Sequence, residues 1–220
     1  MTIAENLKNI YEELPENVHL VAVSKTKPVS DLMEAYQGGQ RIFGENKIQE
    51  MTDKWEQMPK DVQWHMIGHV QTNKVKYMAP YVSLIHGVDS LKLLKEINKQ
   101  AKKWRRVIPC LLQVYIATEE TKFGLAQNEL LEIIHSEEFK ALEHIKVVGL
   151  MGMASFTEDQ EKIRKEFQFL KDVFDYLQPY QLSNCHFQHL SMGMSSDYKI
   201  AIESGSTIVR IGSNIFGSRG

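Results

Sequence analysis

The sequence has few cysteines, no long hydrophobic run and no excess of either charge. Cys110 and Cys185 lie far apart and outside any CxxC spacing, which excludes a disulfide framework and a zinc knuckle. No stretch has the length and apolarity of a membrane span, and the N-terminus has no signal-peptide pattern. We therefore expect a soluble, cytoplasmic protein that does not bind membranes.

Several functional motifs are also absent. The chain contains no P-loop GxxxxGK[ST], no dinucleotide-binding GxGxxG and no GxSxG nucleophile elbow. Its 26 basic and 28 acidic residues give a formal net charge of −2, without a block of one sign. This balance predicts no nucleic-acid partner, and it favours reading the lysine-rich helical segments as solvated faces.

Short β-rich runs alternate with amphipathic segments along the whole chain, which is typical of repeated βα units around a parallel sheet. The cores of these runs are largely apolar, as expected for strands buried on both faces. The eight predicted strands cover residues 19–25, 41–46, 63–69, 81–89, 106–117, 145–153, 187–192 and 207–213.

Eight such units predict a single α/β domain over residues 1–220, built as a closed (β/α)8 TIM-type barrel. The alternative, an open doubly wound sheet, usually has fewer strands in this length. An extra helix over residues 2–14 precedes the first strand, and only residues 217–220 follow the last.

The active site of such a barrel lies at the C-terminal ends of the strands, and Lys25 ends the first one. A lysine that is partly desolvated there has a lowered pKa and can attack a carbonyl to form an imine. The competing interpretation is an exposed loop lysine. Lys27 is a second candidate, but Pro28 follows it and places it in the loop.

The second and third strands end in FGEN and HMIGH. Gly44 permits close backbone approach, and Asn46 is either a ligand contact or the N-cap of the next helix. His65 and His69 could form half of a metal site, but no acidic third ligand stands at a fixed offset. We prefer a packed or hydrogen-bonded His65 and a polar lining role for His69.

Small and hydroxyl residues follow the last two predicted strands, where TIM-type barrels often bind phosphate. Such residues before a helix let backbone N–H groups reach an anion. A phosphorylated aldehyde would satisfy both this cradle and an imine-forming lysine. The residues concerned are Ser191, Gly193, Ser195 and Ser196 in one turn, and Arg210, Gly212 and Ser213 in the other.

Five motifs resemble those of the pyridoxal phosphate homeostasis protein family, a single-barrel relative of the alanine racemase N-terminal domain. The resemblance covers essentially the whole chain. It implies pyridoxal 5′-phosphate (PLP) as cofactor, held as a Schiff base on Lys25. The motifs are AVSKTKP (22–28), FGENKIQE (43–50), WHMIGHVQTNK (64–74), SMGMSSDY (191–198) and AIESGSTIVRIGSNIFG (201–217).

The resemblance also implies the remaining contacts. Phosphate contacts match Ser191, Gly212 and Ser213, while Arg210 faces the pyridine nitrogen and Asn46 lies near the cofactor. Ser213 replaces the commoner threonine and keeps its hydroxyl. Many relatives carry proline and leucine at positions 69 and 70, so the resemblance assigns His69 no role.

The implied function is intracellular PLP (vitamin B6) homeostasis without catalytic turnover, in a monomer that supplies PLP to apo PLP-dependent enzymes or to amines. Arg210 can only donate hydrogen bonds and so disfavours a protonated ring nitrogen. Few residues follow the eighth strand, which leaves no second domain to supply an opposing base.

Two alternatives remain open from the sequence. One is a PLP-dependent amino-acid racemase or lyase that uses Lys25 as base, with Tyr115, Met153 or His69 as the second group. The other is a barrel enzyme that forms a lysine imine with a sugar phosphate and uses no PLP.

Overall fold

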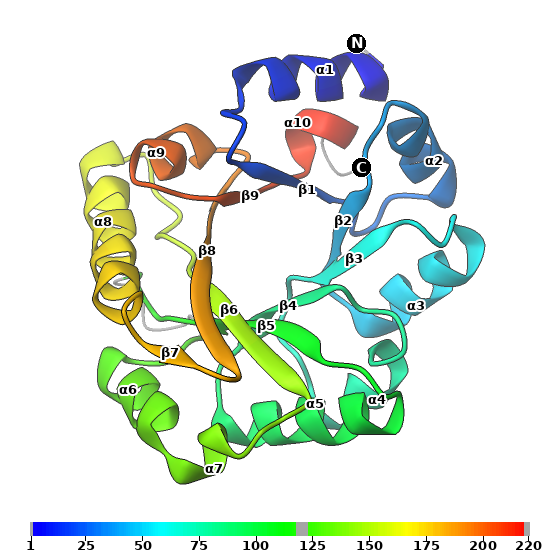
Figure 1. The fold of residues 1–220 in the computed structure, drawn as a ribbon. Helices are drawn as coiled ribbons and strands as arrows, with labels where there is room; N and C mark the ends of the chain where they lie inside the picture. The colour runs from blue at the N-terminus through cyan, green and yellow to red at the C-terminus, as the bar shows by residue number, and fades with distance from the viewer. Residues whose placement is uncertain (1, 118–122, 218–220) are drawn as a thin grey trace.

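Eight parallel strands close into a barrel with helices around it (Figure 1). The computed structural model describes residues 2–117 and 123–217. Around the barrel, β1 to β6 are followed by β8 and β9, and β9 pairs back onto β1. The predicted (β/α)8 barrel is thus confirmed. Its strands are β1 (His19–Val23), β2 (Ile42–Glu45), β3 (Gln63–Met66), β4 (Leu84–Val88), β5 (Ile108–Gln113), β6 (Ile145–Met151), β8 (Cys185–Met194) and β9 (Ile208–Ile211).

The helices pack their apolar stripes against the outside of the barrel. In α8, Phe167, Leu170 and Phe174 lie on one apolar stripe and are buried. No helix of the described residues has the length and hydropathy needed to cross a membrane. The helices are α1 (Ile3–Glu13), α2 (Val29–Gln37), α3 (Ile48–Gln57), α4 (Val75–Met78), α5 (Leu91–Lys103), α6 (Gln127–His135), α7 (Glu137–Lys140), α8 (Gln160–Leu177), α9 (Tyr198–Glu203) and α10 (Ser213–Phe216).

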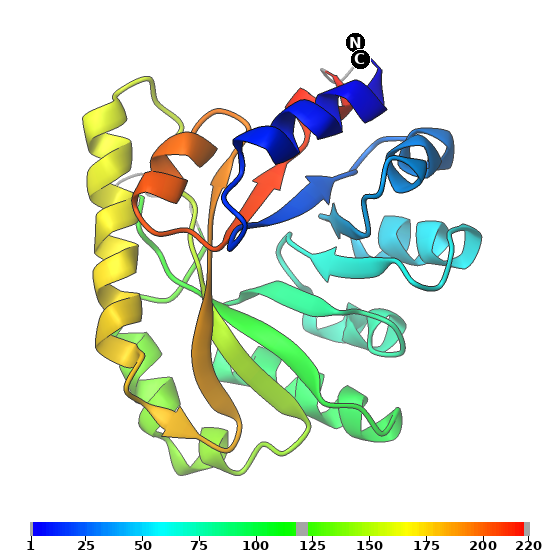
Figure 2. The ribbon, with the colours of Figure 1, turned by 45° about the horizontal axis from the view of Figure 1, so that its top comes forward.

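The predicted N-terminal helix is present as α1 and lies beside α10 (Figure 2). Its start is fixed by a capping box, in which the Thr2 and Glu5 side chains bond each other's backbone N–H. The Asn6 amide donates to the Ile215 carbonyl at 2.9 Å, which ties α1 to the last helix. Helix α10 was not predicted, because one turn is too short to show a helical period.

The strand lengths differ from the predicted ones. β8 has ten residues and β5 only six, whereas residues 106–117 were predicted as the longest strand. A short β7 (Gln181–Leu182), also not predicted, pairs antiparallel with the start of β8. Cys185 opens β8 and, like Cys110 in β5, is fully buried.

Two apolar clusters hold the barrel together. The larger one lies between the strands and the helices. The smaller one comprises Val21, Leu84, Leu111, Val148, Met151 and Ile208. Because side chains alternate along a strand, Val21 points into the barrel while Leu20 and Ala22 face the helices. The barrel interior is therefore largely apolar, and any polar group inside it needs a partner.

Candidate functional site

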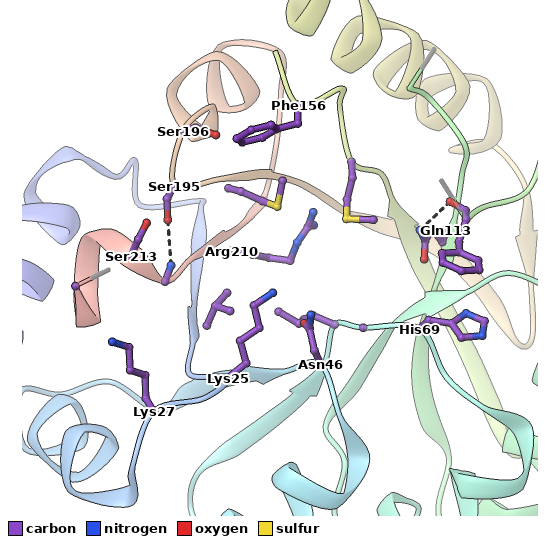
Figure 3. A pocket seen from close by; sticks show the side chains of 18 residues that line it. Lys25, Lys27, Asn46, His69, Gln113, Phe156, Ser195, Ser196, Arg210 and Ser213 are labelled. Atoms are coloured by element: carbon purple, nitrogen blue, oxygen red, sulfur yellow. Dashed lines mark hydrogen bonds between the residues drawn. The ribbon is translucent and has the colours of Figure 1, made fainter. Parts of the chain in front are cut away.

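A cavity of about 500 Å³ opens at the C-terminal ends of the strands, where the sequence analysis expects the site. Figure 3 shows Lys25, Arg210 and Asn46 pointing into its middle. Ser195 and Ser213 stand at one end, and His69 and Gln113 at the other. The cavity thus has a hydroxyl-rich end, a cationic centre and a mixed aromatic end.

Most of the predicted site residues come together here. Lys25, Asn46, Arg210, Gly212 and Ser213 all line the cavity. Their contacts with a cofactor stay a prediction, because the geometry shows only that they share one space. Lys25 lies two residues after β1 and Arg210 lies within β9, so strands that are adjacent in the barrel bring together residues far apart in sequence.

Ser191 lies elsewhere than predicted. It and Gly193 belong to β8 and not to a turn, because β8 stays extended as far as Met194. The Ser191 side chain is fully buried and accepts a hydrogen bond from Arg210 Nη1 at 2.6 Å. It is therefore part of the barrel interior and does not line the cavity.

Two other serines of the same motif line the hydroxyl-rich end. Ser195 and Ser196 follow β8, and the Gly212 N–H donates to Ser195 Oγ at 3.2 Å. Ser213 opens α10 beside them. Lys27 also lines the cavity, with its Nζ donating to the Phe216 carbonyl at 3.0 Å. This end offers hydroxyls, a backbone N–H and a cation, which are the groups that bind phosphate.

The residues on either side of Lys25 are fixed by carboxylates of the next βα unit. The Ser24 hydroxyl donates to Glu45 Oε1 at 2.6 Å, and the Thr26 N–H donates to Glu50 Oε1 at 2.6 Å. Thr26 has φ of 66°, a left-handed conformation that is rare for a β-branched residue. The bond to Glu50 compensates for part of this strain and fixes the direction in which Lys25 leaves the strand.

Lys54 connects these two carboxylates from α3. Its Nζ donates to Glu45 at 2.8 Å, to Glu50 at 2.7 Å and to the Ser24 carbonyl at 2.8 Å. The Glu45 side chain is 0% exposed and that of Lys54 7%. Burial raises the pKa of Glu45, against the opposing effect of the bonds from Lys54 and Ser24. The sequence does not reveal this network, because only the folded structure brings Lys54 behind Ser24.

Asn46 keeps its predicted place at the cavity and is not a helix cap. The N-cap of α3 is Lys47, which makes no side-chain capping bond. Gly68, after β3, passes close by, and a Cβ there would lie 2.4 Å from the Asn46 carbonyl oxygen. A glycine at position 68 thus lets the two loops approach each other at the cavity wall.

His69 lines the far end of the cavity, as predicted. Its Nδ1 lies 3.4 Å from Asp89 Oδ2, and its ring stacks on Phe123 at a centroid distance of 4.7 Å. His65 is buried and bonds His86, so the two histidines do not form a metal pair. Within the described ranges, no group of three His, Cys, Asp or Glu residues could hold a metal ion.

Arg210 lies between the cavity and the barrel interior. It is 4% exposed, and its Nη2 donates to the Gly152 carbonyl at 3.2 Å. Burial lowers the pKa of Arg210 to about 10, with Asp197 acting in the opposite direction. The guanidinium therefore stays charged at neutral pH, and it can only donate hydrogen bonds.

The family model of the alanine racemase N-terminal domain matches residues 1–220. A pyridoxal phosphate homeostasis protein of Aquifex aeolicus is 42% identical over 201 residues, covering 91% of this chain and 86% of the relative. The human protein of the same name is 40% identical over 211 residues, covering 91% of this chain and 76% of its own length.

Solved structures agree with these sequence matches. PipY of Synechococcus elongatus PCC7942 with PLP bound has a TM-score of 0.89 at 32% identity, with 98% of this chain and 100% of PipY covered. Alanine racemase from Bartonella henselae, at 18% identity and a TM-score of 0.73, shares the fold over 99% of this chain and 60% of its own. The chain therefore belongs to the alanine racemase N-terminal domain family, among the relatives named pyridoxal phosphate homeostasis proteins.

Proposed function

We propose that this protein binds PLP in the cavity, as a Schiff base on Lys25, and serves intracellular PLP homeostasis. The observation that carries the proposal is that Lys25 shares one cavity with a hydroxyl-rich, cationic end. PLP carries an aldehyde and a phosphate on one small ring, so it needs both features together. The PLP-bound PipY structure and the names of the relatives support the same cofactor.

The residues present fit this group. The cavity, about 500 Å³, lies within the range of roughly 300–1,000 Å³ common for small-molecule sites. Ser195, Ser196, Ser213 and the Gly212 backbone would hold the phosphate, with Ser195 and Ser196 in the place that the sequence analysis gave to Ser191. Arg210 would face the ring, because its guanidinium points into the middle of the cavity beside Lys25 (Figure 3).

We further propose that the protein holds PLP without turnover. Bound PLP would be a weaker electron sink with its ring nitrogen unprotonated, and a donor-only guanidinium at Arg210 opposes that protonation. Of the three groups considered as a second base, Met153 and His69 line the cavity, but a thioether carries no transferable proton. His69 stands at the far end of the cavity, away from Lys25 (Figure 3). We expect a cytoplasmic monomer that supplies PLP to apo-enzymes.

The test is the visible absorbance of the purified protein with added PLP, before and after borohydride reduction. We expect an imine band that reduction fixes onto the peptide carrying Lys25. Lys25→Ala should lose the band, whereas Lys27→Ala, a second cavity lysine, should keep it and bind PLP more weakly. A protein that stays colourless with PLP and binds sugar phosphates would overturn the proposal in favour of a lysine-imine enzyme.

The absence of turnover has its own test. The PLP-loaded protein is incubated with individual L- and D-amino acids, and racemisation, deamination and decarboxylation products are measured over many equivalents. We expect no product beyond one equivalent per site. Sustained turnover that disappears in Lys25→Ala would establish the racemase or lyase alternative.

A further inference from the structure

A line of hydrogen-bonded side chains leads from the cavity into the barrel interior. Arg210 Nη1 lies 2.6 Å from Ser191 Oγ, which lies 2.9 Å from His86 Nδ1. His86 Nε2 in turn lies 3.0 Å from His65 Nδ1. The four residues come from β9, β8, β4 and β3, and all are buried. Apolar residues dominate the interior around them, so each polar hydrogen here needs an acceptor.

The direction of the first bond follows from Arg210. A guanidinium has donors and no acceptor, so Ser191 Oγ accepts from it. The hydroxyl has a single hydrogen, and His86 Nδ1 is its remaining partner in the described structure. A buried hydroxyl hydrogen without an acceptor would cost about 1–3 kcal/mol. Ser191 therefore donates to His86 Nδ1.

This bond fixes the tautomers of both histidines. His86 Nδ1 accepts, so a neutral His86 carries its proton on Nε2 and donates it to His65 Nδ1. His65 then carries its own proton on Nε2. Burial lowers the pKa of His86 well below its usual value, and it lowers that of His65 to about 3, with His189 adding to the shift. Both rings are neutral at physiological pH.

We propose that Ser191 and His86 are positioning residues, which hold the Arg210 guanidinium at the cavity. Each hydrogen bond of the line is donated in the direction away from the cavity. Each N–H or O–H between these residues points inward, so neither Ser191 nor the two histidines directs a proton donor back toward Arg210 and the cavity. Resting on the proposed function, this line keeps Arg210 a fixed donor at the cofactor ring and keeps the ring nitrogen unprotonated. The role of Ser191 is thus to orient Arg210 from below the cavity.

The first experiment is histidine-selective ¹⁵N NMR on the protein without PLP, and it does not depend on cofactor binding. We expect the Nε2–H tautomer at both His86 and His65, with no protonation at neutral pH. In Ser191→Ala the donor to His86 Nδ1 is lost, and His86 should shift toward the Nδ1–H tautomer or a mixture. An Nδ1–H tautomer at His86 in the wild type would overturn the direction of the line.

The second experiment tests positioning on the PLP-loaded protein. His86→Asn keeps an acceptor near Nδ1, whereas His86→Leu removes it at similar size. We expect His86→Leu and Ser191→Ala each to weaken PLP affinity about tenfold and to change the pH dependence of the cofactor absorbance. His86→Asn should restore both to near wild type.

The outcomes separate this inference from the proposed function. The absence of a cofactor band in the wild-type protein would refute the proposed function, while the tautomer measurement would still test the hydrogen-bonded line from Arg210 to His65. Wild-type binding together with unchanged affinity and spectra in Ser191→Ala and His86→Leu would overturn the positioning role. Near-UV circular dichroism checks that each variant is folded, and because Ser191→Ala and His86→Leu each test the role separately, either one that folds decides the question.

Discussion

Replacing Lys54 by methionine should destabilise the protein strongly, because Lys54 is the only cation found within hydrogen-bonding distance of Glu45 among the described residues. Lys54→Met keeps the unbranched shape and most of the length of the side chain and removes its charge. The Glu45 carboxylate, with a 0% exposed side chain, then stays buried without a counter-ion. Breaking a buried pair in this way costs about 3–5 kcal/mol. For a domain of this size, that corresponds to a fall in Tm of roughly 6–20 °C.

The assay is urea denaturation at neutral pH, followed by circular dichroism. Lys95→Met is the matched control, because Lys95 and Glu138 form an ion pair at 2.6 Å with side chains 45% and 62% exposed. An exposed pair of that kind contributes about 1 kcal/mol or less. The double variant Glu45→Gln with Lys54→Met should recover much of the loss, since it leaves no buried charge.

The loss should also depend on pH. Burial already raises the pKa of Glu45 in the folded state, and removal of Lys54 raises it further. Between the unfolded pKa and this raised value, the folded variant binds more protons than the unfolded chain, so its stability increases as the pH falls. The deficit of Lys54→Met should therefore shrink as the pH is lowered from neutral toward the unfolded pKa of a glutamate. A loss as small as that of Lys95→Met, or one independent of pH, would refute the reasoning.

Three further outcomes follow from buried groups. Gly149→Ala should give no folded protein by circular dichroism, because its Cβ would lie 1.8 Å from the His189 carbonyl oxygen; a folded variant of native stability would contradict this contact. Cys110 and Cys185 are buried, and burial raises the pKa of both thiols, that of Cys185 to about 12, so native protein should react with a thiol reagent far more slowly than protein in denaturant. Burial lowers the pKa of His65 from 6.5 to about 3, so below pH 6.5 the unfolded chain binds a proton that the folded protein does not, and the free energy of unfolding falls. In denaturation measured at several pH values, His65→Gln should reduce this dependence of stability on pH.

The sequence predicts the barrel and the location of its site because both depend on local patterns. Apolar runs mark the strands, and the residues just beyond their C-terminal ends, such as Lys25 and Asn46, fall at one end of a parallel barrel by geometry alone. Ser191 lies within the predicted strand 187–192, but its side chain points into the barrel interior and not into the cavity; that placement depends on the pairing of β8 with β6 and β9, which no local pattern records.

The networks behind the site were missed for the same reason. Lys54 looks like any lysine on an amphipathic helix, and His86 looks like a residue of a buried strand. Each acquires its role only from partners on other units, Glu45 and Ser24 for Lys54, and Ser191 for His86. Such pairings are tertiary contacts, and a single sequence does not specify them.

The pairing of β1 with β9 makes the cavity a late product of synthesis. His19 pairs with Ile208, so the contact that closes the barrel joins its first strand to its last. Contacts of such high sequence separation form slowly, because a long loop must first be ordered. A nascent chain that has not reached β9 has Lys25 but no Arg210 or Ser213 to go with it. A ligand that needs all three of these residues could bind only after β9 has been made and the barrel has closed.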